Sequence, residues 1–159
     1  MNSTNNGLAH RRIVICGSMA FHGRMLDQKR RLTEAGIETI TPDADPRVIQ
    51  MVQVEDWRQL KRKASMRHIR RVRDQKTFGI LVMNLDKYGI HDYIGPNTFA
   101  EIAIAFAHYK QIYLFQNIPE FYQDELVAWG AVALNGRLSH LVNAFQRAAL
   151  LEIMQPRLF

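Results

Sequence analysis

The sequence predicts a single α/β domain built on a five-stranded parallel sheet with a flavodoxin-like, doubly wound strand order. Three observations lead to this prediction. Short runs of β-branched and other apolar residues alternate with helical segments, and two of these runs end at Gly17 or Pro42. No apolar run reaches the roughly 20 residues needed to span a bilayer. A chain of 159 residues suits one core, so we expect one non-membrane domain.

The first elements follow a β-α-β order. Residues 11–16 form a β-branched apolar run that ends at Gly17, which is typical of a buried first strand. Apolar residues at helical spacing predict a helix over 22–35, with Gly36 as its C-terminal cap. Residues 37–41 then predict the second strand.

The remaining elements are predicted by the same two periodicities. The expected helices cover 46–76, 98–109, 119–128 and 137–154, and the expected strands cover 79–85, 111–116 and 131–134. In a doubly wound sheet the ligand lies beyond the carboxyl ends of the strands. The loops over 17–24 and 86–98 should therefore form the site.

Residues 1–10 are small and polar, and we expect them to form a disordered tail before a domain over 11–159. They lack the apolar segment of a signal peptide, and the single cysteine, Cys16, cannot form an internal disulfide. We therefore expect a cytoplasmic protein. The six histidines are scattered, with no two at positions i and i+4, so we expect no metal site.

The positive charge is concentrated in one predicted helix. The chain has a net charge of +6, and residues 58–73 contain basic side chains and no acidic one. Three interpretations remain open: a solvated helix face, arginines that reach a substrate phosphate, and a nucleic-acid surface. The last is the least favoured, because no aromatic stacking partner lies between Arg58 and Arg73.

Glu101 is the most distinctive polar residue, because the predicted helix over 98–109 is otherwise apolar on every side. Its spacing from Thr98 fits a capping box at a helix start. Alternatively, a carboxylate in the first turn faces the ligand crevice, where the helix dipole keeps it ionised. Because a sheet covers one face of this helix, we expect the other face to contact a second subunit in a homodimer or larger homo-oligomer.

Two blocks of the chain resemble the nucleoside 2-deoxyribosyltransferase superfamily, which includes nucleoside monophosphate N-glycosidases. The blocks are Ile-Val-Ile-Cys-Gly-Ser-Met over 13–19 and the segment from Ile94 to Lys110, which contains Gly-Pro-Asn-Thr-Phe-Ala-Glu; Leu-Val-Met-Asn over 81–84 lies between them. The resemblance covers about residues 12–118. It implies a flavodoxin-like fold, an oligomer, no metal, and attack by Glu101 on the anomeric carbon of a nucleoside.

The chemistry and the resemblance together predict the site residues. A carboxylate beneath the sugar stabilises or traps the oxocarbenium-like state, and a second acid protonates the departing base. We expect Glu101 to be the nucleophile and Asp92 or Asp86 to be the acid. The expected substrate contacts are Gly17, Ser18, Met19, Phe21, Arg24, Asn84, Gly95, Asn97 and Thr98. We expect a nucleoside or nucleotide substrate and no cofactor.

The chain departs from the family pattern at three positions. Many transferases carry an Asp where Gly95 stands, a Gly where Asn97 stands, and an acidic residue at the start of the third strand, where this chain has Phe78. These departures favour hydrolysis or an unusual substrate over base exchange. The alternative function is a non-catalytic nucleotide-binding or sensing module. Phosphoribohydrolases of the lysine decarboxylase-like family share the Thr-x-x-Glu pattern, but only Gly95 stands for their glycine-rich loop.

Overall fold

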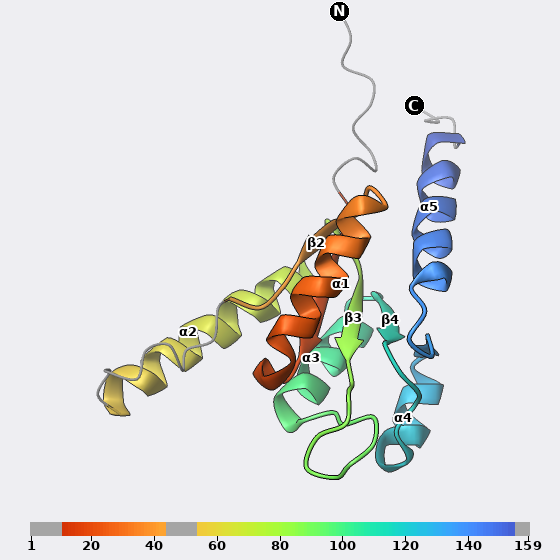
Figure 1. Cartoon of the computed structure of the whole chain (residues 1–159). Helices are drawn as coiled ribbons and strands as arrows, with labels where there is room; N and C mark the ends of the chain where they lie inside the picture. The colour runs from red at the N-terminus through yellow and green to blue at the C-terminus, as the bar shows by residue number, and fades with distance from the viewer. Residues whose placement is uncertain (1–10, 44–53, 155–159) are drawn as a thin grey trace, which may run out of the picture.

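The computed structural model describes residues 11–43 and 54–154, and in that part of the chain five strands form one parallel sheet with the order β2-β1-β3-β4-β5 (Figure 1). The strands are β1 (Arg12–Gly17), β2 (Glu38–Ile40), β3 (Thr77–Met83), β4 (Gln111–Leu114) and β5 (Val132–Ala133). This order is the flavodoxin-like doubly wound arrangement, so the predicted fold class is confirmed.

Five α-helices connect and cover these strands. They are α1 (His22–Glu34), α2 (Val54–Arg73), α3 (Pro96–Ala107), α4 (Gln123–Ala128) and α5 (Ser139–Met154), with short 3-10 turns η1 (Met19–Phe21) and η3 (Glu120–Tyr122). All five predicted helices that fall on described residues are present. The predicted tail over 1–10 and the predicted helical residues 46–53 lie outside the described residues.

The core has two layers because side chains on a strand alternate between the two faces of a sheet. Ile13 and Ile15 of β1 pack with α1 and α5, whereas Val14 and Cys16 pack on the side covered by α2, α3 and α4. All four side chains are fully buried. This alternation directs the Cys16 thiol towards α2 and α3.

The third strand and the helix after it both begin earlier than the sequence predicted. Strand β3 starts at Thr77, whose hydroxyl donates to the Arg71 carbonyl, and it ends at Met83. Helix α3 starts at Pro96, because proline lacks a backbone N–H and has a fixed φ that suits the first helical position. The loop between them therefore runs from Asn84 to Gly95.

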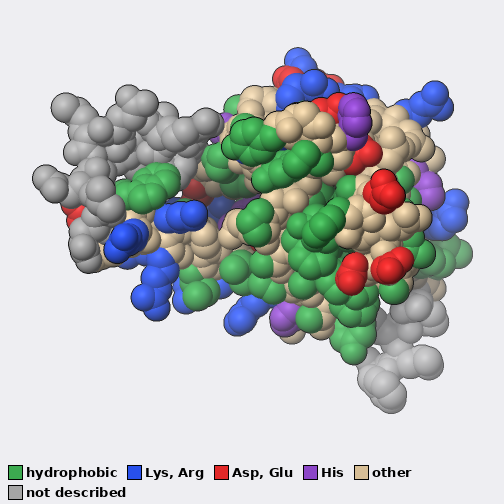
Figure 2. Space-filling view, turned by 90° about the horizontal axis from the view of Figure 1, so that it is seen from below, with side chains coloured by type: hydrophobic (Ala, Val, Ile, Leu, Met, Phe, Trp, Pro, Cys, Tyr) green, Lys and Arg blue, Asp and Glu red, His purple; other side chains and the backbone are tan. Residues whose placement is uncertain are grey.

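Helix α2 runs out from the sheet, as Figure 1 shows, and few of its residues are buried. Of its apolar side chains, Val72 is fully buried near the C-terminal end, whereas Met66 is 47% exposed. Figure 2 shows the molecule from the edge at which the strands end, and Lys and Arg side chains lie along the part that projects from the sheet. None of the described helices is long and apolar enough to cross a bilayer.

Candidate functional site

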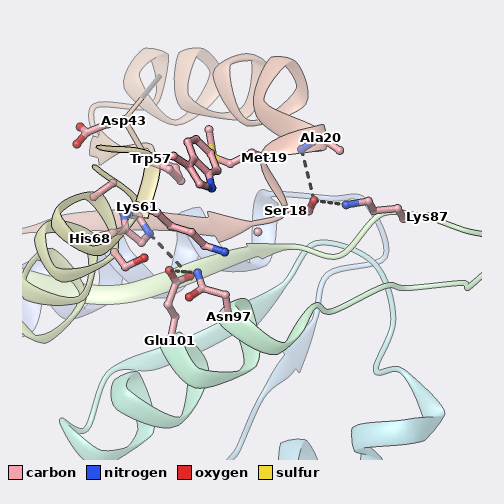
Figure 3. A pocket seen from close by; sticks show the side chains of 14 residues that line it. Ser18, Met19, Ala20, Asp43, Trp57, Lys61, His68, Lys87, Asn97 and Glu101 are labelled. Atoms are coloured by element: carbon pink, nitrogen blue, oxygen red, sulfur yellow. Dashed lines mark hydrogen bonds and ion pairs between the residues drawn. The ribbon is translucent and has the colours of Figure 1, made fainter. Parts of the chain in front are cut away.

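A pocket of about 360 Å³ opens at the carboxyl ends of β1 and β3, between the loop after β1 and helices α2 and α3 (Figure 3). Residues 17–20 form one wall, Asn97 and Glu101 of α3 form a second, and Trp57, Lys61 and His68 of α2 form a third. Strand β1 pairs with β2 on one side and β3 on the other, so the chain reverses its winding direction at this point. Ligands of doubly wound sheets bind at such a switch point.

Glu101 lies in the second turn of α3 and not at its start. The N-terminal cap of the helix is Gly95, and Thr98 is the third helical residue, so the capping-box interpretation is wrong. The Glu101 side chain lines the pocket and is only 5% exposed. Its Oε1 accepts a hydrogen bond from Asn97 Nδ2 at 3.3 Å, across one helical turn.

Burial raises the pKa of the Glu101 carboxyl to about 7, although hydrogen bonds from Cys16 and Asn97 oppose this shift. The expectation that the helix dipole keeps Glu101 ionised is therefore opposed by burial, which brings the pKa of this carboxyl close to neutral pH. The helix dipole acts most strongly within the first turn, and Glu101 lies beyond that turn. Desolvation of the carboxylate therefore has the larger effect on its pKa.

Cys16, His68 and Glu101 come from three different elements and meet at the base of the pocket. Cys16 Sγ lies 3.5 Å from His68 Nε2, and the same Nε2 lies 3.9 Å from Glu101 Oε2. All three side chains are buried. Burial and the nearby Glu101 carboxyl also raise the pKa of the Cys16 thiol well above its usual range.

His68 is neutral at physiological pH. Burial lowers its pKa to about 4, and the positive charge of Arg71 acts in the same direction. Asp43 and the backbone of Ile15 oppose this shift without reversing it. The contact between His68 and Glu101 is therefore not an ion pair.

The loop after β1 is held in place by Ser18 and Lys87. Ser18 Oγ accepts hydrogen bonds from the Ala20 backbone N–H at 3.4 Å and from Lys87 Nζ at 2.6 Å. Lys87 Nζ also lies over the ring of Tyr88, 4.7 Å from its centroid. This lysine brings the loop after β3 into the pocket wall.

Gly17 is required where the loop leaves β1. Its φ is 154°, and a Cβ at this position would lie 2.9 Å from Met25 Cε and 3.1 Å from the Met83 carbonyl oxygen. Any side chain here would push on the core beneath the pocket. The predicted substrate contacts Gly17, Ser18, Met19 and Asn97 all line the same pocket as Glu101.

Asp86 and Asp92 line a different depression, together with Phe21 and Arg24. Asp86 is exposed and accepts hydrogen bonds from His91 Nδ1 at 2.7 Å and from the Asp92 backbone N–H at 3.1 Å. The hydrogen bond from His91 lowers the pKa of Asp86 below its usual range. The structure therefore does not bring these four predicted site residues to the Glu101 pocket.

Three further residues were predicted to contact the substrate, namely Asn84, Gly95 and Thr98. They are not among the residues that line the Glu101 pocket, and they have structural roles instead. Asn84 is fully buried and joins the ends of β3 and β4, because its Nδ2 donates to the Asn117 carbonyl and its Oδ1 accepts from the Gln116 N–H. Gly95 caps α3, and Thr98 is buried in its first turn.

Sequence reasoning missed the residues that α2 contributes to the pocket, namely Trp57, Lys61, Ala64, Ser65 and His68. A signal was present, because positions 57, 61, 64 or 65, and 68 repeat at the spacing of one helix face. The dense positive charge of the segment concealed this face. Lys87 and Asp43 were also missed, and both lie just after strands, in loops without a recognisable pattern.

The sequence matches no family model, and no curated protein and no solved structure is significantly similar to it.

Proposed function

We propose that the protein is an enzyme that cleaves the N-glycosidic bond of a nucleoside or nucleoside 5′-monophosphate, by hydrolysis or by transfer of the sugar to another base. The observation that carries the proposal is Glu101, a buried carboxyl in the wall of a pocket at the switch point of a doubly wound sheet. The resemblance of the segments around Gly17 and Glu101 to deoxyribosyltransferases supports the same activity.

The other side chains of the pocket suit a nucleoside. Trp57 offers an aromatic face on which a base can stack, and it lies across the pocket from α3 in Figure 3. The Lys61 ammonium group extends from α2 towards Asn97 and Glu101. Sugar hydroxyls and a phosphate can accept hydrogen bonds from Lys61 and Lys87.

In the proposed mechanism, the Glu101 carboxylate attacks the anomeric carbon while the bond from that carbon to the base breaks. The base leaves with the bonding electrons and takes a proton from a donor in the pocket, for which Lys61 is our candidate. Asn97 holds one carboxylate oxygen by its hydrogen bond to Oε1. Water then cleaves the glycosyl ester in hydrolysis, whereas a second base cleaves it in transfer.

The activity is tested by incubating the protein with nucleosides and 5′-nucleotides and measuring free base by chromatography. We expect the wild type and the control variant Glu125→Gln, on the exposed surface of α4, to release base from at least one member of the panel. Glu101→Gln has nearly the same shape and should release none above background. Equal rates for Glu101→Gln and the wild type would contradict the catalytic role.

A second candidate function is a non-catalytic nucleotide-binding module, and one observation favours it. Besides Glu101, the described carboxylate that lines the pocket is Asp43, which is held by Arg67 at 2.5 Å and by Arg71 at 3.1 Å. No carboxylic acid among the described pocket residues is thus left free to protonate a departing base. A nucleotide that raises the melting temperature yet is recovered unchanged would favour this module.

We further propose a homo-oligomer. A chain of ring contacts runs over α3, η3 and α4, from Phe121 through Tyr122, Phe99 and Trp129 to Phe106. These contacts cover part of the outer face of α3 within the same chain, but Phe106 is still 45% exposed and Phe121 87% exposed. Such a patch is typical of a protein interface.

The oligomer is tested by sedimentation equilibrium of the wild type, Phe121→Asp and the control Tyr88→Asp. Tyr88 is 78% exposed and lies in the loop after β3, where its ring contacts Tyr93 and not a member of the aromatic chain of α3 and α4. We expect an oligomer that only Phe121→Asp weakens. A monomeric wild type would contradict the proposal.

A further inference from the structure

We propose that Cys16, His68 and Glu101 form a binding site for a single divalent transition-metal ion, and that Zn²⁺ suits the three donor atoms best. They bring a thiol sulfur, an imidazole nitrogen and a carboxylate oxygen within 4.8 Å of one another. Zn²⁺ is bound in proteins by these three types of ligand. The scattered positions of histidine along the sequence concealed this convergence.

The distances between the donor atoms are close to those of a tetrahedral site. Zinc–ligand bonds of roughly 2.0–2.3 Å place neighbouring tetrahedral ligands roughly 3.3–3.8 Å apart. Cys16 Sγ and His68 Nε2 are already 3.5 Å apart, and His68 Nε2 and Glu101 Oε2 are 3.9 Å apart. A small rotation of the Glu101 carboxylate towards Cys16 would complete the three-ligand face.

The His68 ring is oriented for this role, because one nitrogen, Nε2, faces both the sulfur of Cys16 and the carboxylate of Glu101. In a catalytic triad the two ring nitrogens would instead face different partners. Asn97 donates to Glu101 Oε1, which leaves Oε2 directed at the cluster. Such outer hydrogen bonds orient the ligands of metal sites.

Charge and access also fit a bound ion. A Cys16 thiolate and a Glu101 carboxylate would balance the charge of Zn²⁺, so that the buried site would carry no net charge. Binding releases the thiol proton, and the proton of any protonated carboxyl, to solvent. His68 and Glu101 line the pocket, which provides an entry path and a fourth coordination position for water.

A bound ion would occupy the carboxylate that the proposed reaction uses as its nucleophile. Zn²⁺ should therefore act as a reversible inhibitor of base release, and substrate and ion should exclude each other. This consequence rests on the proposed function, whereas the binding of the ion does not.

Co²⁺ is the probe for the site, because a thiolate ligand produces a charge-transfer absorption band and tetrahedral coordination produces intense visible bands. The full chain, reduced with a phosphine, is titrated with Co²⁺ and then with Zn²⁺ against a chromophoric chelator. We expect one ion per chain. Cys16→Ala should lose the charge-transfer band, and His68→Gln and Glu101→Gln should lose tight binding. Asn97→Ala should weaken binding by about 10- to 100-fold.

His91→Gln is the matched control, because His91 also contacts a carboxylate, Asp86, but on the surface. It should bind Co²⁺ as the wild type does. Circular dichroism of each metal-free variant checks that it is folded. A wild-type titration without the thiolate band, or equal binding by the wild type, Cys16→Ala and His68→Gln, would overturn the proposal.

The two proposals fail separately. Tight Co²⁺ binding without base release from any substrate would contradict the enzyme and leave the metal site standing. Base release that Glu101→Gln abolishes, from a protein that binds no Co²⁺, would contradict the metal site alone.

Discussion

The pocket around Glu101 and the loop around Asp86 lie at the same edge of the sheet, yet they shift the pKa of a carboxyl group in opposite directions. Burial raises the pKa of Glu101 to about 7, whereas a hydrogen bond from His91 lowers the pKa of the exposed Asp86. Glu101 lies in a pocket lined by the loop after β1 and by helices α2 and α3, whereas Asp86 accepts a hydrogen bond from the backbone of its own loop. The position of a carboxylate after a strand therefore does not decide its chemistry; its solvent exposure and its partners do.

Exchange of each carboxylate for its amide should separate the two regions most clearly. We expect Glu101→Gln to lower base release by about 10³-fold or more, because it removes the nucleophile. Asp86→Asn should lower it by less than about tenfold, whereas loss of a general acid would cost about 10²- to 10⁴-fold. Initial rates under saturating substrate measure both. Comparable losses in the two variants would remove the distinction between the two regions.

The next effect concerns the glycines of the two regions. Gly17 beneath the pocket and Gly89 in the loop both have positive φ, but only Gly17 would place a Cβ against Met25 and Met83. We expect Gly17→Ala to lower the free energy of unfolding by about 2–5 kcal/mol, from backbone strain and overpacking together. Gly89→Ala should cost about 1–2 kcal/mol from strain alone. Urea denaturation measures both, and a larger loss for Gly89→Ala would contradict this account of the pocket wall.

A smaller effect is expected from the lysines of α2. Lys61 lines the pocket, whereas Lys63 is an exposed residue of the same helix that does not line it. Lys61→Met should lower base release by about 10²-fold, the low end of the loss expected for a general acid, because the candidate proton donor to the departing base is removed. Lys63→Met removes the same charge and should leave the rate unchanged. Equal losses would show that α2 acts only through its overall positive charge.

The smallest effect is a change in fluorescence. The chain has two tryptophans, of which Trp57 lines the pocket and Trp129 stacks between Phe99 and Phe106. We expect a bound nucleotide to quench Trp57, so the quench should persist in Trp129→Phe and disappear in Trp57→Phe. A quench that follows Trp129 instead would place the ligand on the aromatic surface of α3 and α4.

The fold class and the edge of the sheet at which the pocket forms could both be predicted from local patterns in the sequence. The apolar run over 13–16 is typical of a strand that is buried on both faces, as in a covered parallel sheet, and the alternation of strands with helices leads to right-handed crossovers. That alternation places the segments after Gly17 and before Glu101 at one edge. These features depend on local periodicity, which a single sequence displays.

The choice of side chains that share the pocket depends instead on tertiary packing. Cys16, His68 and Glu101 are far apart in the chain and meet only because α2 packs beside α3 over one face of the sheet. The path of the loop that contains Asp86 separates it from Glu101, and a helix start at Gly95 moves Glu101 into the second turn. Helix packing and loop paths depend on contacts between distant residues, so local periodicity could not predict them.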